Sequence, residues 1–473
     1  MGRKNKKGRS QKDASLDDDE NTFEGEIDRL SEDHTIAESI TSLADDFEAD
    51  TDAEEIEDLI ITGSAGDNSQ AAASNRHARC IDSLNTVEDL ITEKRSARRE
   101  AGLRRLFRAV THFGSTNTIS PYQPEVLSLC IQSIRGGKPA EQYAACRLLE
   151  AWAVVLGADH DDFFESIETP LRRALGMAIR APLVRIAALR AFTLSNFICA
   201  SDDMSTESLL DLCEEVAAKE YRNHAVPALL RAAALECWAL LSTTIDDFYI
   251  SGSNDDHNGR GLILLPLIQE CLEGEASLEL RSAAGECLAI IHEARVNLGD
   301  IDGENGTERR YGQGGWENSE WEETMDCLQQ NIVHISNQSG HSISKKAKKE
   351  QRAIFREYVS TIVDGEFPQQ SVSFRGGTLT LTSWKEVVQL NFIRHCLQGG
   401  LQTQILTNPT LQSIFSADGN VLNSDGHLSQ LEKRLFLSKT SEASKQAYVD
   451  RNKKRQTRNN IKNHFLTTDG EDI

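Results

Sequence analysis

Short sequence motifs of small and apolar residues recur along the middle of the chain, and we call them the repeated words. A pair of small residues inside an apolar stretch begins at positions 101, 144, 187, 233 and 283, so the steps are 43, 43, 46 and 50 residues. A repeat of two or three helices in a HEAT or armadillo array takes about 40–47 residues. The pattern therefore predicts an all-α fold, a HEAT/armadillo-like α-solenoid in which small residues let neighbouring helices approach. Unrelated Ala-rich amphipathic helices are the alternative.

The spacing of apolar positions also predicts where the helices lie. A Ser120-Pro121 start and a Gly136-Gly137 end bound one of them. No stretch of the repeat region alternates with period two, so we expect no strands there. The other helices are expected at about residues 86–113, 138–157, 161–177, 182–199, 204–219, 225–243, 261–273 and 277–297.

The region after residue 320 has a different pattern. It predicts helices at residues 320–337 and 345–362, and then a small hairpin around Gly376-Gly377. Ser383 is placed to cap a helix that begins at Trp384, and a short helix follows at residues 408–415.

Changes in composition divide the chain into five parts. The expected parts are residues 1–79, a disordered tail that is first basic and then acidic; residues 80–298, the helical repeats; residues 299–319, a flexible acidic and Gly-rich loop; residues 320–438, the remaining helices and a small, mostly helical C-terminal domain; and residues 439–473, a basic terminal helix and tail. Low hydrophobicity with high charge is the reason for expecting disorder in the tail.

Charge is distributed very unevenly along the chain. The net charge is −23, yet residues 344–465 hold 19 Lys and Arg against 10 Asp and Glu. Residues 13–58, in contrast, hold twenty acidic residues and the single basic residue Arg29. An acidic body with a basic end indicates a nucleic-acid contact at one end of the molecule.

The C-terminal words resemble a known family. The order KKAKKEQRAIFRE (residues 345–357), GEFPQQSVSF (365–374), LTLTSW (379–384) and NPTLQSIF (408–415) resembles the C-terminal domain of the interferon-related developmental regulator family. LELRSAAGECLAIIHEA (278–294) resembles that family's helical domain. Family members usually carry a His after the Gly pair, where this chain has Gln402 and Gln404. The resemblance implies no catalytic residues, and roles as transcriptional co-regulators or ribosome-associated translational repressors.

The end of the chain is the strongest candidate for RNA binding. Arg451, Arg455, Arg458 and Lys462 fall on one stripe of a helix that has little apolar surface with which to pack on the body. Such a stripe suits phosphate contacts, which are salt-sensitive and independent of sequence. A solvated basic tail and a nuclear import signal are the alternatives. The full predicted RNA-binding set is Lys445, Arg451, Lys453, Lys454, Arg455, Arg458, Lys462, Lys345, Lys346, Lys348, Lys349 and Arg352.

Acidic residues of the repeats suggest a second kind of surface. A solenoid groove could take protein partners, with Glu236, Glu286 and Glu214-Glu215 as candidates, although ordinary solvated helix faces are the favoured explanation of these residues. The cluster Asp159-His160-Asp161-Asp162 is expected to serve a helix start.

No motif predicts catalysis, a cofactor or a metal site. The ten cysteines include no C-x-x-C pair, and most lie in apolar helical words, so they are expected to be small buried hydrophobes. The sequence has neither a signal peptide nor a membrane span of about 18 apolar residues. The uneven charge and the family resemblance together lead us to expect a non-enzymatic regulator of gene expression that binds the ribosome or another RNA assembly, with the cytoplasm as its main location and the nucleus as a second one. The alternative is a nuclear transcriptional co-regulator scaffold.

Overall fold

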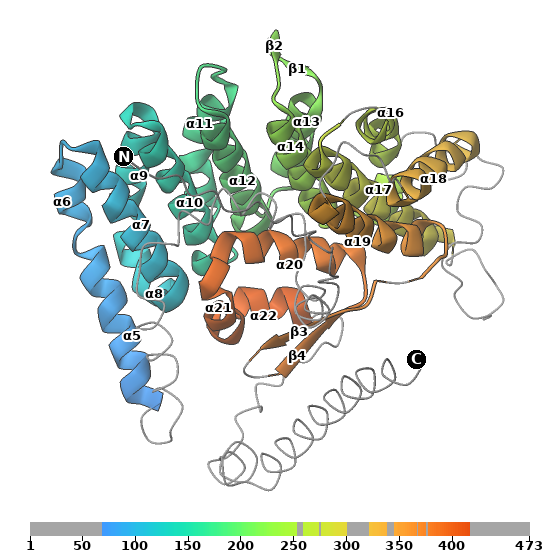
Figure 1. Cartoon of the computed structure of the whole chain (residues 1–473). Coiled ribbons are helices and arrows are strands. Elements are labelled where there is room, and N and C mark those ends of the chain that lie inside the picture. The colour runs from blue at the N-terminus through green and yellow to red at the C-terminus, as the bar shows by residue number, and fades with distance from the viewer. Residues whose placement is uncertain are drawn as a thin grey trace, which may run out of the picture.

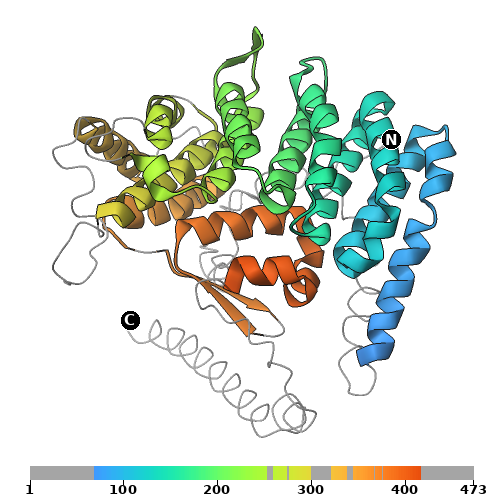
Figure 2. The same cartoon turned by 180° about the vertical axis from the view of Figure 1, so that it is seen from behind.

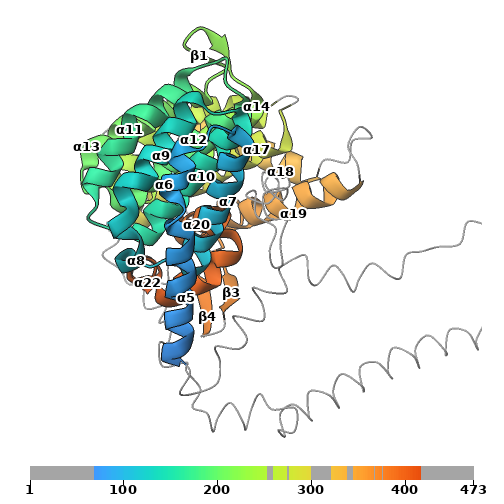
Figure 3. The same cartoon turned by 90° about the vertical axis from the view of Figure 1, so that its left-hand side faces the viewer.

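A computed structural model describes residues 69–252, 259–273, 276–299, 321–337, 345–366, 368–374 and 377–416. Within them the chain forms an α-solenoid of two helical layers (Figure 1; Figure 3). The predicted all-α solenoid is confirmed. The expected tail over residues 1–79 and the basic terminal helix over residues 439–473 lie wholly or mostly outside these residues.

The inner layer is the row of helices that carries the repeated words. Each inner helix packs on the next one along the chain. Their small and apolar residues are almost completely buried, which is why the words recur at the repeat period. The inner helices are α7 (Ser96–Phe113), α10 (Pro139–Leu156), α12 (Pro182–Cys199), α14 (Ala228–Ser242) and α17 (Leu278–Gly299).

The outer layer pairs one helix with each inner helix. A break separates the two helices of the first pair, because the backbone is extended at Glu93 and the carboxylate of Glu93 accepts a hydrogen bond from the amide of Arg95 at 2.9 Å. The prediction of one helix over residues 86–113 is therefore wrong. The outer helices are α6 (Val87–Thr92), α9 (Gln123–Gly136), α11 (Asp161–Gly176), α13 (Asp203–Ala217) and α16 (Arg260–Leu272).

Short elements complete the turns between these helices. Ser120-Pro121 lies in a single 3-10 turn, η1 (Ser120–Tyr122), and α9 begins three residues later than predicted. A hairpin of β1 (Glu220–Tyr221) and β2 (His224–Ala225) corrects the expectation that the repeats hold no strand. Its turn residues Arg222 and Asn223 both have left-handed backbone conformations. Two further short helices in the turns are α8 (Thr116–Ile119) and α15 (Asp247–Ser251), and a longer helix, α5 (Ser69–Leu84), comes before the first repeat.

After α17 the chain folds back across the inner layer (Figure 2). Helices α18 (Glu322–Asn337) and α19 (Lys345–Ile362) pack together at the far end of the solenoid, and α19 also contacts α17. The hairpin of β3 (Gln370–Phe374) and β4 (Gly377–Leu381) follows, as predicted. The chain then forms α20 (Trp384–Leu397), the 3-10 turn η2 (Gln398–Gly400), α21 (Leu401–Thr407) and α22 (Pro409–Ser416).

We call residues 384–416 the closing segment, because they lie against the inner layer. Its first helix begins at a capping box in which Ser383 and Glu386 bond each other's backbone, which confirms the predicted cap. Helix α20 then contacts α10, α14 and α17, while η2 and α21 contact α7. The segment thus spans the inner layer from one end to the other.

Candidate functional site

Helix α19 is the part of the predicted RNA-binding surface that the structure describes. Arg352 and Arg356 are exposed, one helical turn apart, whereas Phe355 and Tyr358 are buried on the other side of the helix. The Tyr358 hydroxyl donates to the carbonyl of Ser282 at 3.1 Å. The ring of Tyr358 lies so close to Gly285 that a side chain at that position would clash with it. Gly285, a small residue of the last repeated word, therefore leaves the space in which Tyr358 packs and holds α19 against α17.

The other predicted RNA-binding residues are not placed. Lys345, Lys346, Lys348 and Lys349 belong to the first turns of α19, but only their backbone is described. Lys445, Arg451, Lys453, Lys454, Arg455, Arg458 and Lys462 all lie outside the described residues.

A second set of charged residues appears only once the repeated words are superimposed on the fold. The fourth residue of every word is charged, and all five residues lie on inner helices. We call this set the charged ladder: Arg104, Arg147, Arg190, Glu236 and Glu286. Its sign changes from positive to negative along the solenoid, and its last four members are buried.

The positive part of the ladder holds the C-terminal end of α20. Both protons of Nη2 of Arg147 are used, with distances of 2.8 Å to the carbonyl oxygen of His395 and 3.0 Å to that of Cys396. Arg147 also forms a buried ion pair with Glu150 on its own helix. Carbonyls at a helix C-terminus carry partial negative charge, so a buried guanidinium is well matched to them.

At its other end α20 meets a carboxylate. The backbone amide of Trp384, at the start of α20, donates to Oε2 of Glu293 at 2.8 Å. Glu293 lies in α17, two turns after the last ladder residue. The helix dipole of α20 is therefore aligned with the change of sign along the inner layer, which favours this direction of α20 over the reverse.

The middle of the ladder is an ion pair between neighbouring repeats. Arg190 in α12 pairs with Glu236 in α14, and its guanidinium lies 4.1 Å from the ring centroid of Phe392 in α20. Burial raises the pKa of Glu236, and the charge of Arg190 partly offsets that rise. Covered by an aromatic ring, this pair belongs to the junction with the closing segment and not to an open surface.

Glu286 has the most perturbed carboxyl group of the ladder. Burial raises its pKa to about 8, the neighbouring charge of Glu236 adds to the rise, and Arg190 opposes it. The interpretation of Glu236 and Glu286 as solvated or groove-lining residues is therefore wrong, because both are covered in the fold. Glu215 is exposed, as expected, whereas Glu214 accepts hydrogen bonds from Trp238 and Arg260.

Two amide side chains fix the last part of the closing segment. Nε2 of Gln404 lies 3.0 Å from the carbonyl oxygen of Thr111 and 3.1 Å from that of Gly114, and so caps the end of α7. Nδ2 of Asn408 donates to the carbonyl of Val154 at 2.7 Å. Gln404, which stands where the family usually has a His nearby, is thus a buried structural contact, whereas Gln402 is exposed.

The acidic cluster near residue 160 has a local role, as predicted. Asp161 and Asp162 lie in the first turn of α11, and the carboxylate of Asp161 accepts hydrogen bonds from the amide and hydroxyl of Ser201. The described residues hold no grouping of His, Cys, Asp and Glu suited to a metal ion. All ten cysteines are free, and nine of them are buried.

Among the helices that the structure describes, one is long and apolar enough in composition to be compared with a membrane span. It is α12, and 83% of it is buried inside the fold, so it is a core helix of the solenoid.

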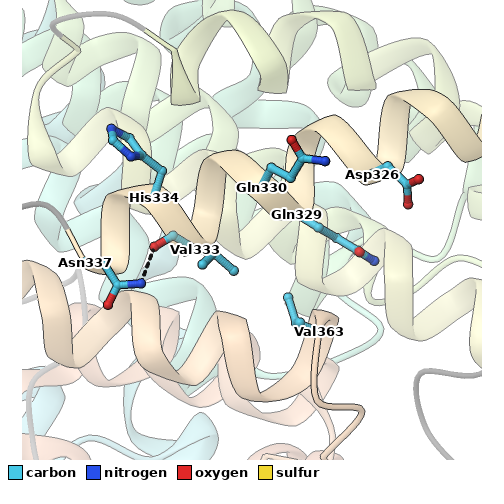
Figure 4. A pocket seen from close by; sticks show the side chains of 7 residues that line it. All are labelled: Asp326, Gln329, Gln330, Val333, His334, Asn337 and Val363. Atoms are coloured by element: carbon cyan, nitrogen blue, oxygen red, sulfur yellow. Dashed lines mark hydrogen bonds between the residues drawn. The ribbon is translucent and has the colours of Figure 1, made fainter.

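A hollow of about 640 Å³ lies beside α18 and the end of α19 (Figure 4). It is lined mainly by polar residues, and the side chain of Asn337 bonds back to the carbonyl of Val333 at 3.0 Å. Asp326 and His334 are the two titratable residues among those that line it. The lining residues are Asp326, Gln329, Gln330, Val333, His334, Asn337 and Val363.

Sequence reasoning missed the ladder, although a signal was present. A charged residue at the same place in five apolar words is unusual, because charges are rarely buried without a partner. Superimposing the words would have separated Arg147 and Glu286 from ordinary surface residues. It would not have identified their partners, which are up to 249 positions away in the chain.

Comparisons with known proteins point to one family. Residues 48–363 match the family model described as Interferon-related developmental regulator (IFRD). The chain is 25% identical to the mouse protein Interferon-related developmental regulator 2 over 364 residues, which cover 74% of this chain and 76% of the mouse protein. It is 22% identical to mouse Interferon-related developmental regulator 1, with coverage of 77% and 79%, and 21% identical to the human protein of that name, with 77% and 78%.

Proposed function

The chain belongs to the interferon-related developmental regulator family, and from that premise we propose that it is a regulator of gene expression without catalytic activity. In this proposal it binds the ribosome or another RNA assembly through its basic C-terminal segment and represses translation. It acts in the cytoplasm and also enters the nucleus. No cofactor is required.

The position of the basic helix α19 is the observation that carries this proposal. Its apolar side is fixed to α17 through Phe355 and Tyr358, so Arg352 and Arg356 are held facing solvent. Arginines held on a rigid helix can contact phosphates with little further loss of side-chain entropy. Neither Arg352 nor Arg356 forms an ion pair within the described part of the chain.

The charge of the sequence beyond α19 supports the same partner. Residues 344–465 carry nine more basic than acidic residues in a protein whose net charge is −23. An acidic body is repelled by RNA, so a contact confined to the basic end would direct that end toward the RNA. We propose that residues 441–465 enter an RNA-walled channel and leave the solenoid outside, where occupancy excludes mRNA or tRNA.

The alternative is a nuclear co-regulator scaffold that binds protein partners in the solenoid groove. A partner on the inner layer would have to replace the closing segment, which already bonds Arg147 and the end of α7. That requirement favours the RNA proposal, in which the solenoid interior stays closed.

Sedimentation of cell extracts tests the proposal directly. The full-length chain is compared with a truncation at Lys439 and with the variant Arg352→Glu/Arg356→Glu. We expect the full chain in ribosomal fractions, the truncation at the top of the gradient, and a partial loss for the α19 variant. Arg105→Glu, which reverses the charge of one exposed arginine of α7, is the control for charge reversal away from α19 and should sediment like the parent.

Treatment with ribonuclease and salt separates the two proposals. Phosphate contacts weaken steeply as salt rises, so the ribosomal signal should disappear above moderate salt and after ribonuclease digestion. A truncated chain that still sediments with ribosomes would exclude the terminal segment as the docking element. Nuclear, salt-resistant complexes with proteins would favour the scaffold.

A further inference from the structure

The turns of the solenoid form two rims. Turns that lead from an outer to an inner helix lie along one edge, at the top of Figure 1, and turns that lead onward to the next outer helix lie along the opposite edge. Adjacent turns of the first rim touch. Ser96 bonds Glu141 at 2.6 Å, Arg180 bonds the carbonyl of Ile134 at 2.7 Å, and Gly176 lies against the guanidinium of Arg222. The first rim is therefore one continuous surface.

Over the first four repeats the two rims have opposite charge, whereas the fifth outer-to-inner turn, residues 273–277, holds two Glu and no Lys or Arg. Residues 93–98, 135–138, 173–180 and 218–227 form the basic rim and hold nine Lys and Arg against two Glu. Residues 114–122, 157–162, 200–203 and 243–247 form the acidic rim and hold seven Asp and no Lys or Arg. Acids at the starts of outer helices suit the helix dipole. The dipole does not account for the bases, because most of them lie in the turns or at the starts of inner helices.

Most of the charge on the basic rim has no partner within the described residues. Six of its basic side chains are exposed and form no ion pair there. Ile179, 92% exposed, and Met177, 38% exposed, lie among them on the turn between α11 and α12. The six are Lys94, Arg95, Arg135, Lys138, Arg173 and Arg222. Such a surface suits a ligand that is strongly acidic and also carries apolar side chains.

A segment of this chain has that composition. Residues 13–58 hold twenty acidic residues and one basic residue, together with nine Leu, Ile and Phe. A nucleic acid would match the charge of the rim but would leave Ile179 and Met177 without a role. Tethering also favours the segment, because a short linker gives an effective concentration of the order of millimolar.

The segment can reach the rim. Helix α5, 16 residues and so about 24 Å long, rises beside the first repeat toward the turn between α6 and α7 (Figure 3). The ten residues 59–68 span up to about 33 Å when extended. A chain that runs back along α5 therefore brings residues 13–58 to Lys94 and Arg95, at one end of the basic rim.

We propose that the basic rim is a docking surface for the acidic segment, residues 13–58, of the same chain. The contact is electrostatic along the rim and apolar at Ile179 and Met177. It leaves the basic C-terminal segment free, so it does not depend on the proposed function.

Zero-length cross-linking of the full chain tests this contact. A carbodiimide joins a lysine amine to a carboxylate that touches it, and peptide mass spectrometry identifies the pair. We expect the monomer to contain links from Lys94, Lys138 and Lys219 to carboxylates of residues 13–58. The link between Lys385 and Asp247, whose Nζ and Oδ1 are 2.6 Å apart, is the internal positive control.

Charge reversal distinguishes docking from random collision. Arg135→Glu/Arg173→Glu should reduce the rim links several-fold and leave the Lys385–Asp247 link unchanged, whereas Arg105→Glu should alter neither. Raising the salt to 1 M, where the Debye length is about 3 Å, should have the same effect as the rim variant.

Three outcomes would overturn the proposal. One is a control link without any link from residues 13–58 to the rim lysines. Another is rim links found only in cross-linked dimers. In the third, the rim lysines are protected from amine modification only when an RNA oligonucleotide is added, and the same protection is seen after residues 1–68 are deleted. That result would make the rim a nucleic-acid surface.

Discussion

The inner layer and the rims of this solenoid both carry charge at regular intervals, but they differ in what satisfies it. On the inner layer, Arg147 and Arg190 are buried, and their partners are the closing segment and neighbouring helices. On the basic rim, Arg135 and Arg173 are exposed and form no ion pair within the described residues. Charged residues that recur at the repeat period in this protein are thus either buried and partnered or exposed on the surface. Which of the two applies depends on whether a distant part of the chain covers them.

The difference also limits where partners can bind. An inner layer is the usual binding surface of a solenoid, but here the chain's own α20 and α21 occupy it. The exposed edges, the outer faces of the solenoid and α19 remain open for interactions. Each prediction below tests whether polar and charged residues of the inner layer affect the stability of the fold, whereas rim charges do not.

The largest effect is expected at Arg147. Replacing it with Met leaves Glu150 buried without its cation and removes the donor of the His395 and Cys396 carbonyls. We expect the free energy of unfolding to fall by about 3–5 kcal/mol, which is the usual cost of breaking a buried pair. Urea unfolding followed by tryptophan fluorescence measures it.

Arg105→Met, on the exposed side of α7, is the control and should change stability by no more than about 0.5 kcal/mol. An equal loss in both variants would contradict the comparison.

Glu286 should make stability depend on pH. Its pKa is raised from 4.5 to about 8 in the fold, so between these values the folded state binds more protons than the unfolded state. Stability is then lost as the pH rises through that window. Because Gln cannot ionise, Glu286→Gln should be more stable than the parent by about 3 kcal/mol at pH 7 and nearly equal to it near pH 4.5.

Thermal or urea unfolding across pH 4.5 to 8.5 gives this comparison. Glu215→Gln, at an exposed position of α13, is the control and should follow the parent at every pH. If Glu286→Gln also follows the parent throughout, Glu286 is not held neutral by burial.

A smaller effect is expected at Gln404, with a control two residues away. Gln404→Leu removes the donor that caps the carbonyls of Thr111 and Gly114, and we expect a loss of about 1–3 kcal/mol. Gln402→Leu changes an exposed residue of the same helix and should cost no more than about 0.5 kcal/mol. Urea midpoints of the two variants, measured side by side, decide whether the amide at position 404 matters.

The smallest effect on stability is expected on the rim. Arg135→Glu/Arg173→Glu alters two exposed arginines that form no described ion pair, so we expect a change of no more than about 0.5 kcal/mol per site. The same urea titration measures it. A loss as large as that of Arg147→Met would mean that the rim charges are structural and would remove the distinction between the two regions.

Local chemistry explains which predictions from the sequence succeeded. The repeated words located all five inner helices, because small residues are needed wherever helices of adjacent repeats approach. The cap at Ser383 and the β3–β4 hairpin each depend on a few neighbouring positions, so both could be predicted directly from the sequence. The break at Glu93 and the hairpin at residues 220–225 were missed because each depends on a single turn conformation.

The sequence by itself determined the repeat, its helices and the placement of one charged residue in every word. Only the tertiary structure decided that the last four of those charges are buried, because the segment that covers them lies up to about 250 residues away and no local pattern links the two. It also decided that turns separated by about 40 residues meet as two rims of opposite charge. The repeat period can be seen in residues that are close in the sequence, whereas burial depends on which distant segments pack over those residues in the folded chain.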